Sequence, residues 1–163
     1  MTHPNLRSAS VLVINPHGQV LVVNRKSGVG VCMPGGKVEE DEDFSTAAAR
    51  EILEETGLRI NPSRLLSIYR GPCPSEDGRS FDTTTFLALH WEGELGGEEP
   101  ELDPRWSDWD ALIEGSPFKD YNLAMARDGF FKYLQTHTQW TPKLEAWMHA
   151  FTEHVDLSHR SAA

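Results

Sequence analysis

The sequence predicts one α/β domain built from layers of strands and helices, and three observations lead to this fold class. Short β-rich runs occupy the first part of the chain, an amphipathic helical segment follows them at residues 44–56, and further helical segments come only near the end. Strands interleaved with helices in this way are typical of layered α/β folds. A length of 163 residues is enough for one domain with a sizeable core.

The first strands are expected at residues 10–15 and 19–24, where β-rich runs flank Pro16, His17 and Gly18. Proline and glycine at these positions favour a tight turn, so the two runs predict a β-hairpin. A short apolar run then leads to Pro34-Gly35-Gly36, where the chain must turn. The remaining expected strands are residues 65–69, 82–91 and 106–109, and the expected loops are the Gly/Pro-rich segments 71–78 and 93–103.

The best-defined helix is expected at residues 44–56. Asp43 is a good N-cap, and Gly57 provides the usual C-terminal stop. A second helix is expected at 123–134, and Thr141-Pro142 opens a third, amphipathic helix that continues to about Val155. The predicted organisation is a flexible N-terminus at 1–8, a domain at 9–136, and a helical extension and tail at 137–163.

Composition excludes several function classes. The formal net charge of −10 argues against a broad nucleic-acid surface, which requires basic residues. The apolar runs are too short to span a membrane, and the first residues contain no apolar signal region, so we expect a cytoplasmic protein. Two cysteines without a motif spacing predict free thiols.

Acidic residues are concentrated between residues 39 and 55, where Arg50 is the only basic residue among eight acids. Such a concentration favours bound cations, which reverse the local field and allow an anionic substrate to approach. The acids are Glu39, Glu40, Asp41, Glu42, Asp43, Glu51, Glu54 and Glu55.

On a helix at 44–56, Glu51, Glu54 and Glu55 share one face, whereas the buried stripe is expected to contain Ala48, Ala49, Ile52 and Leu53. Like charges at this spacing repel, which destabilises an isolated helix unless a divalent cation offsets the repulsion. Neighbouring carboxylates raise one another's pKa, which predicts activity at neutral to alkaline pH. The alternative is an ordinary solvated acidic face.

The glycine turn and the acidic helix together resemble the signature of the Nudix hydrolases, G-x5-E-x7-R-E-U-x-E-E-x-G-U, where U is bulky and apolar. Gly36 is followed at the required spacings by Glu42 and then by the run from Arg50 to Leu58. Every fixed letter and both apolar positions match. The resemblance implies the Nudix α/β/α sandwich with a mixed β-sheet from about residue 8 to 135, with the third helix as an extra C-terminal element.

The resemblance also implies roles for the residues of the signature. It assigns Gly35 a carbonyl that faces a metal, Glu54 and Glu55 the role of metal ligands, and Glu51 the role of ligand or general base. Arg50 would orient Glu51, and Glu42 would brace the loop. The implied cofactor is Mg²⁺, with Mn²⁺ as a substitute, and the implied chemistry is attack of water on one phosphorus of a diphosphate linkage.

One further acidic ligand is expected from the loop before Trp106. Glu101 is the candidate we favour from the sequence, and Glu98 and Glu99 compete with it. The alternative is an acidic loop that is simply solvated.

Substrate identity is less well determined. Arg25 and Lys26 are candidate phosphate contacts, with a plain surface role as the alternative, and Gly36 is a candidate substrate contact. Asn122 falls where some relatives that hydrolyse nucleoside triphosphates read a purine, although it is also a reasonable helix N-cap. Pro72 and Pro74 lie near the position of a proline in relatives that cleave ADP-ribose. We therefore expect a (d)NTP or modified (d)NTP substrate, with ADP-ribose, another nucleoside-diphosphate sugar, or a catalytically silent nucleotide-binding module as alternatives. A monomer or a homodimer is compatible with the sequence.

Overall fold

The computed structural model describes residues 6–75, 77–114, 121–125 and 128. The third helix and the tail lie outside the described residues, as does most of the expected second helix at 123–134. Of that helix, residues 123–125 and 128 are described, and they are helical.

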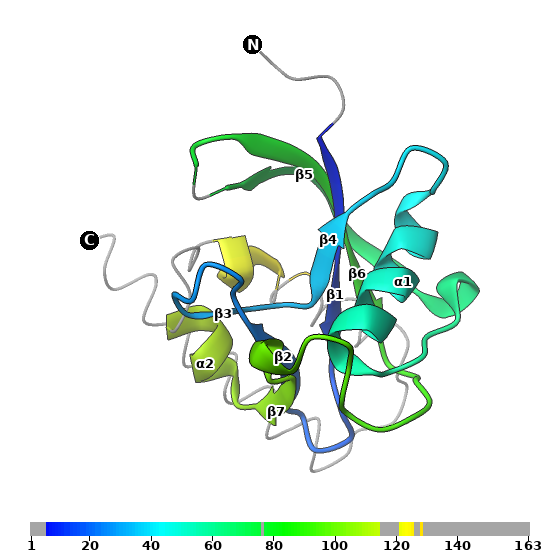
Figure 1. Ribbon diagram of the computed structural model, residues 1–163, viewed down its shortest axis with the longest axis vertical. Coiled ribbons are helices and arrows are strands. Elements are labelled where there is room, and N and C mark those ends of the chain that lie inside the picture. Colours follow the sequence, from blue (N-terminus) through cyan, green and yellow to red (C-terminus); the bar gives the residue numbers. More distant parts are fainter. Residues whose placement is uncertain (1–5, 76, 115–120, 126–127, 129–163) are drawn as a thin grey trace.

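The strands form two sheets (Figure 1). In the four-stranded sheet, β1 pairs with β6 in parallel and with β4 antiparallel, and β5 pairs antiparallel with β6 at the other edge. The three-stranded sheet is antiparallel, with β2 between β3 and β7. The bounds are β1 Arg7–Val13, β2 Val20–Asn24, β3 Val31–Cys32, β4 Gly35–Lys37, β5 Leu66–Pro74, β6 Ser80–Ala88 and β7 Arg105–Ser107.

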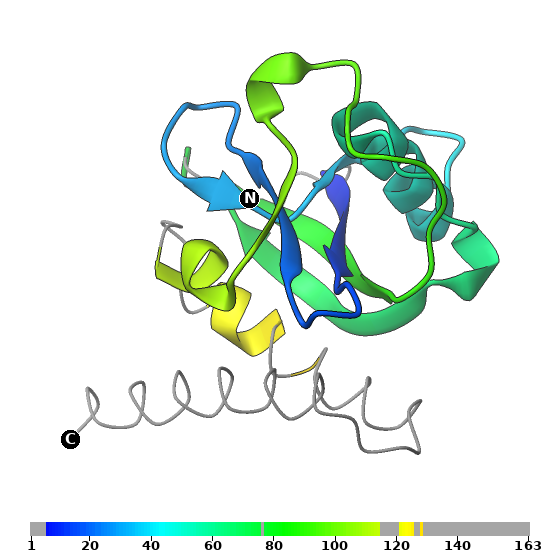
Figure 2. The same ribbon diagram turned by 90° about the horizontal axis from the view of Figure 1, so that it is seen from below.

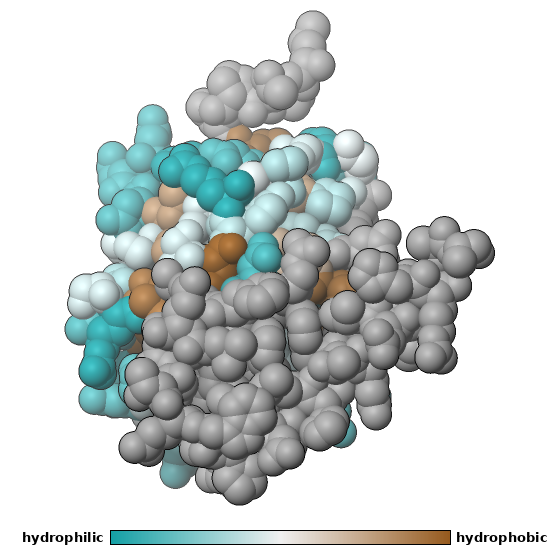
Figure 3. Space-filling model, turned by 180° about the vertical axis from the view of Figure 1, so that it is seen from behind, coloured by the Kyte–Doolittle hydropathy of each residue, from teal (hydrophilic) through white to brown (hydrophobic). Residues whose placement is uncertain are grey.

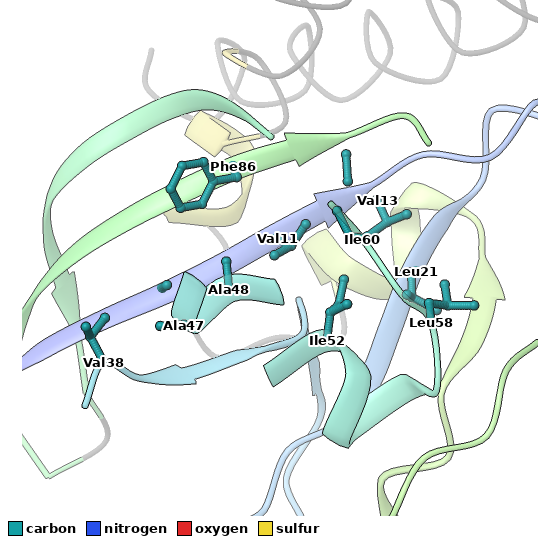
Figure 4. Close-up of a cluster of buried hydrophobic side chains, with 12 residues drawn as sticks. Val11, Val13, Leu21, Val38, Ala47, Ala48, Ile52, Leu58, Ile60 and Phe86 are labelled. Atoms are coloured by element: carbon teal, nitrogen blue, oxygen red, sulfur yellow. The ribbon is translucent and has the colours of Figure 1, made fainter. Parts of the chain in front are cut away.

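Helices lie on both sides of β1, as Figures 1 and 2 show. Val11 and Val13 pack with α1 (Phe44–Thr56), whereas Leu12 and Ile14 belong to a second core with α2 (Trp109–Glu114) and Met125. Figure 4 shows the first of these cores, with Ala48 and Ile52 beside β1. β1 is buried on both faces, which confirms the expected α/β class. The sheet is mixed, as expected, because β1 pairs in parallel with β6 and antiparallel with β4. Two short 3-10 turns, η1 (Pro62–Arg64) and η2 (Pro100–Leu102), lie in the connections.

The expected hairpin is only partly correct. The turn forms, since the Gly18 amide donates to the Asn15 carbonyl and Gly18 has a positive φ of 78°. However, β1 and β2 are joined by the single bridge between Ile14 and Val20 and then diverge into different sheets. β1 also begins at Arg7, inside the segment that was expected to be a flexible N-terminus.

The expectation of a loop at 71–78 was wrong for its first half. Residues from Gly71 to Pro74 continue β5 and pair with β6. Pro72 and Pro74 are tolerated because β5 is an edge strand, where a missing amide donor breaks no ladder. Helix α2 was not expected, and β7 is shorter than the predicted strand at 106–109.

Helix α1 has the expected bounds and caps. The Asp43 carboxylate accepts the Thr46 amide at 2.7 Å, and Gly57 adopts the left-handed conformation with φ of 78°. The buried stripe is different from the predicted one, because Leu53 is 46% exposed. Its buried residues are Ala47, Ala48, Glu51, Ile52, Glu55 and Thr56. Two of the three glutamates therefore face inward.

Few large hydrophobic side chains are exposed in the described part of the chain. On the face opposite that of Figure 1, polar side chains surround a few separate hydrophobic ones (Figure 3). Val29 and Leu53 are the exposed large hydrophobic residues among those described. No helix in the described ranges has the length and apolar character needed to cross a bilayer.

Candidate active site

The inward-facing glutamates of α1 converge on the glycine turn before and within β4. The Gly35 amide donates to Glu55 Oε2 at 3.0 Å. At Gly36 the Glu51 carboxylate approaches so closely that a β-carbon would overlap it. Gly35 is also tightly placed, because a β-carbon there would meet the backbone of Ala9 and Ser10 in the neighbouring strand. The two glycines thus let a strand and two carboxylates approach one another.

Arg50 connects the other acids of the site. Its guanidinium donates two hydrogen bonds to Glu42, at 2.6 and 2.9 Å, and one to Glu51 Oε1 at 2.9 Å. It also reaches Glu54 Oε2 at 3.4 Å and the Lys37 carbonyl at 2.9 Å. Glu42 in turn accepts the Glu39 amide at 3.0 Å. This planar, fully charged donor fixes the loop after β4 to the helix and orients the Glu51 carboxylate.

Burial raises the pKa of both inward-facing glutamates, Glu51 and Glu55. Desolvation raises the pKa of Glu55 to about 7, and the hydrogen bond from Gly35 opposes this increase. Burial also raises the pKa of Glu51 despite the neighbouring Arg50 guanidinium. For Glu42 the direction is opposite, since its hydrogen bonds from Arg50 lower the pKa. The elevated pKa values expected from mutual repulsion therefore arise mainly from burial, with repulsion from Glu54 at Glu51 and from Glu51 at Glu55 as smaller contributions.

The acidic loop at 93–103 is attached to the C-terminal end of α1. Gly96 and Glu98 donate their amides to the carbonyls of Thr56 and Glu54, both at 2.8 Å. Gly97 has φ of 108°, and a β-carbon on it would lie 2.7 Å from the Glu55 carbonyl oxygen. Carbonyls at a helix end lack partners within the helix, so this loop satisfies them from outside.

Of the three candidate loop acids, Glu99 is the one whose charge affects the pKa of a buried glutamate, Glu55. The Glu99 carboxylate is 3.5 Å from the Lys26 ammonium and contributes to the elevated pKa of Glu55. Glu101 is exposed on η2, where its carbonyl accepts the Asn24 amide at 3.2 Å. Both acids line a hollow of about 660 Å³ together with Arg25 and Lys26.

A cleft of about 440 Å³ opens beside the glycine turn. One wall consists of residues 35–37, and Arg25 also lines the cleft. The opposite wall comes from β5, β6, the connection between them, and the helical residues 121–122. Its lining residues include Cys73, Pro74, Ser75, Asp77, Phe81, Thr83, Tyr121 and Asn122. This volume is within the range of small-molecule binding sites.

Hydroxyl groups connect the strands at the floor of this cleft. Ser8 is hydrogen-bonded to Thr83, and Ser10 Oγ lies 2.8 Å from Thr85 Oγ1, which is 3.1 Å from the Tyr121 hydroxyl. Sequence reasoning missed these residues. The signal was the repeated hydroxyl at every second position in residues 8–10 and 83–85, which places both pairs on one face of adjacent strands.

Asn122 lies in the cleft lining but is nearly buried, at 4% exposure. Its Nδ2 donates to the Leu112 carbonyl at 3.0 Å. One amide donor is therefore committed to the fold. Cys32 and Cys73 are both free thiols that line the same cleft, and burial raises the pKa of Cys32 to about 11.

The donor set at the glycine turn fits a hard divalent cation. It consists of the carboxylate oxygens of Glu51, Glu54 and Glu55 together with the backbone oxygens of the glycine turn. Oxygen ligands of this kind suit Mg²⁺. No three His, Cys, Asp or Glu side chains in the described ranges are already arranged to hold a metal. Arg50 and the Gly35 amide already donate hydrogen bonds to these carboxylates.

Comparison with known proteins agrees with this geometry. The NUDIX domain family matches residues 4–134, which is most of the chain, and the protein belongs to that family. The resemblance and the Nudix fold expected from the signature are confirmed.

Individual relatives extend the match. An oxidized purine nucleoside triphosphate hydrolase from Danio rerio is 35% identical over 132 residues, covering 77% of this chain and 83% of the relative. A MutT-like protein from Streptomyces ambofaciens is 38% identical over 71 residues, which cover 42% of this chain and 46% of the relative. The chain thus matches less than half of the length of the latter protein.

A solved structure shows the same fold. The crystal structure of a MutT NUDIX hydrolase from Burkholderia pseudomallei superposes with a TM-score of 0.62 at 23% identity. The match covers 76% of this chain and 97% of that chain.

Proposed function

We propose that this protein is a Mg²⁺-dependent pyrophosphohydrolase that cleaves a purine nucleoside triphosphate, including oxidised forms, between two of its phosphates. The observation that carries the proposal is the convergence of Glu51 and Glu55 on Gly35 and Gly36 at the edge of a nucleotide-sized cleft. The name of the relative from Danio rerio supports the choice of substrate class.

In this proposal Glu51, Glu54, Glu55 and the Gly35 carbonyl hold the metal, and Mn²⁺ can replace Mg²⁺. The bound cation supplies charge neutralisation at the phosphates and a lower pKa for the attacking water. Among the loop acids, we favour Glu99 over Glu101 as an additional ligand because Glu99 affects the pKa of Glu55 directly.

Other residues of the chain orient the reactants. Glu51 accepts the proton of the attacking water at its carboxylate, which Arg50 holds through a 2.9 Å hydrogen bond. Arg25, which lines the cleft, contacts the phosphates. Tyr121 and Asn122 place the base against the opposite wall. The walls of the cleft exclude bulk water, which strengthens each of these electrostatic interactions.

The decisive experiment is incubation of the purified protein with Mg²⁺ and a panel of 8-oxo-dGTP, ordinary (d)NTPs and ADP-ribose, followed by product identification. From the triphosphates we expect two products, a nucleoside monophosphate and inorganic diphosphate. Glu55→Gln should lower kcat by about a thousandfold, since a metal contributes several kcal/mol of charge stabilisation. Glu40→Gln is the matched control, because Glu40 is exposed outside the carboxylate cluster.

The panel also tests the alternatives. Preferential cleavage of ADP-ribose would favour the nucleoside-diphosphate sugar class and overturn the triphosphate proposal. Tight binding without turnover of any substrate would identify a catalytically silent module instead.

A further inference from the structure

A second hollow of about 510 Å³ shares no lining residue with the cleft at Gly35–Lys37. It lies where the chain leaving α1 meets the chain leaving β6. Arg59 and Glu92 form an antiparallel bridge there, with their backbone amides and carbonyls paired in both directions at 2.9 Å. Two backbone segments that are distant in sequence thus form one rigid wall.

The hollow collects positive charge in a protein of net charge −10. Arg59, Arg64 and His90 line it, and Glu92 is the acid among its described lining residues. Within the ranges that the structure describes, neither guanidinium takes part in an ion pair or a side-chain hydrogen bond. Two arginines with open donor positions are suited to a phosphate group, which accepts bidentate hydrogen bonds from the guanidinium fork.

An aromatic ring stands beside these charges. Trp91 lines the hollow and remains partly exposed, while its other side rests against Trp106, with ring centroids 5.1 Å apart at 38°. Packing against Trp106 fixes the orientation of the indole, so its exposed area is a preformed stacking surface. A nucleobase stacks favourably on such a surface.

We infer that this hollow is a second ligand site, separate from the active site, for a nucleoside phosphate whose phosphate binds Arg59 and Arg64 and whose base stacks on Trp91. Asn61, which also lines the hollow, can offer its amide donors to the ligand because its Oδ1 already accepts the Ser63 amide and hydroxyl. The volume accommodates a nucleoside monophosphate.

The test is a titration of the full chain with AMP in EDTA, followed by ¹H–¹⁵N NMR. Without divalent cations there is no turnover, so the result does not depend on the proposed enzymatic activity. We expect saturable shifts of the amides of residues 59–61, 63–64 and 89–92 and of the Trp91 indole, which Trp91→Phe identifies. Inorganic phosphate should shift the amides of residues 59–61 and 63–64 alone and bind more weakly than AMP.

Arg59→Ala and Arg64→Ala should each weaken AMP binding about tenfold or more, as expected for loss of a charged hydrogen bond. Arg70→Ala is the matched control, because it removes an exposed arginine elsewhere and should leave the affinity unchanged. Amide dispersion in the same spectra reports whether each variant is folded. Shifts confined to residues 35–37 and 121–122, equal affinity in all three variants, or adenosine binding as tightly as AMP would each overturn the inference.

Discussion

The two walls of the candidate active-site cleft are built in different ways. On one wall, the backbone of the glycine turn lines the cleft. Behind it, charged side chains from a single continuous stretch, Gly35 to Glu55, are held by one another through Arg50 and the Gly35 amide. On the other wall, hydroxyl, thiol and amide groups predominate, and Asp77 between β5 and β6 adds one carboxylate. The comparison teaches that the chemistry is specified locally, whereas the surface that would select the substrate is assembled from distant parts of the chain.

Among variants of the two walls, the largest loss of activity should follow from Gly36→Ala, which adds a β-carbon to the charged wall. Gly36→Ala displaces the Glu51 carboxylate, which is the side chain that its β-carbon would meet. We expect kcat to fall about 100-fold to 1000-fold, as for loss of a general base, with little change in stability. Steady-state kinetics and urea denaturation measure the two quantities. Gly35→Ala is the contrasting variant, because its β-carbon meets backbone and should cost about 1–3 kcal/mol of stability. Equal stability losses in both variants would contradict this distinction.

The second prediction concerns pH, because the charged wall contains a buried carboxyl whose pKa is raised from 4.5 to about 7. The folded state favours the protonated Glu55. Its stabilising contribution is therefore complete below pH 4.5 and is lost as the pH rises through 7. Relative to Glu55→Gln, the metal-free protein should lose about 3 kcal/mol of unfolding free energy between these pH values. Urea denaturation across the range measures this difference, and a difference independent of pH would contradict it.

Mg²⁺ should restore the unfolding free energy that is lost when Glu55 ionises. A cation competes with the proton for Glu55, so its effect on Tm should increase from pH 5 to pH 8. A Tm shift that decreases over this interval would contradict the assignment of Glu55 as a ligand.

The opposite wall should affect substrate affinity more than turnover. Asn122→Ala removes the amide that lines the cleft and also bonds Leu112. We expect KM for the preferred nucleotide to rise about tenfold with kcat nearly unchanged, since uniform binding is lost. The variant should also lose about 1–3 kcal/mol of stability, because the Leu112 carbonyl stays buried without its donor. Lower stability with an unchanged KM would assign Asn122 a purely structural role.

The smallest effect should distinguish the two loop acids next to the charged wall. Glu99→Gln removes a carboxylate that influences Glu55, so the Mg²⁺ concentration for half-maximal activity should rise by about threefold to tenfold. Glu101→Gln, on the exposed side of η2, should change this concentration much less. Activity titrations with MgCl₂ at fixed substrate measure both values. The reverse order would restore Glu101 as the ligand.

The sequence predicted the charged wall well because its determinants are local. Asp43 and Gly57 define the ends of α1, and the spacing of Gly36 and Glu51 places the glycine turn opposite the helix. The helix face was less well predicted. Leu53 is exposed, whereas Glu51 and Glu55 are buried, because contact with the glycine turn outweighs the apolar pattern.

The opposite wall could not be derived in the same way. Tyr121 meets Thr85 through folding, and no short-range pattern connects these positions. The continuation of β5 to Pro74 was also missed, since proline usually indicates a loop and only the edge position of β5 explains its presence. The Asn15–Gln19 turn was correctly predicted, but the separation of β1 and β2 depends on their partners β6 and β7.

The attachment of Gly96 and Glu98 to the end of α1 has a consequence for biosynthesis. During translation, the acidic helix emerges well before the segment that completes its last turn. A nascent chain that stops before Glu98 would leave the carbonyl of Glu54 without this partner, beside the carboxylates that we propose bind a cation. We therefore expect the end of the helix, and the proposed metal site beside it, to be completed only after this loop has been synthesised.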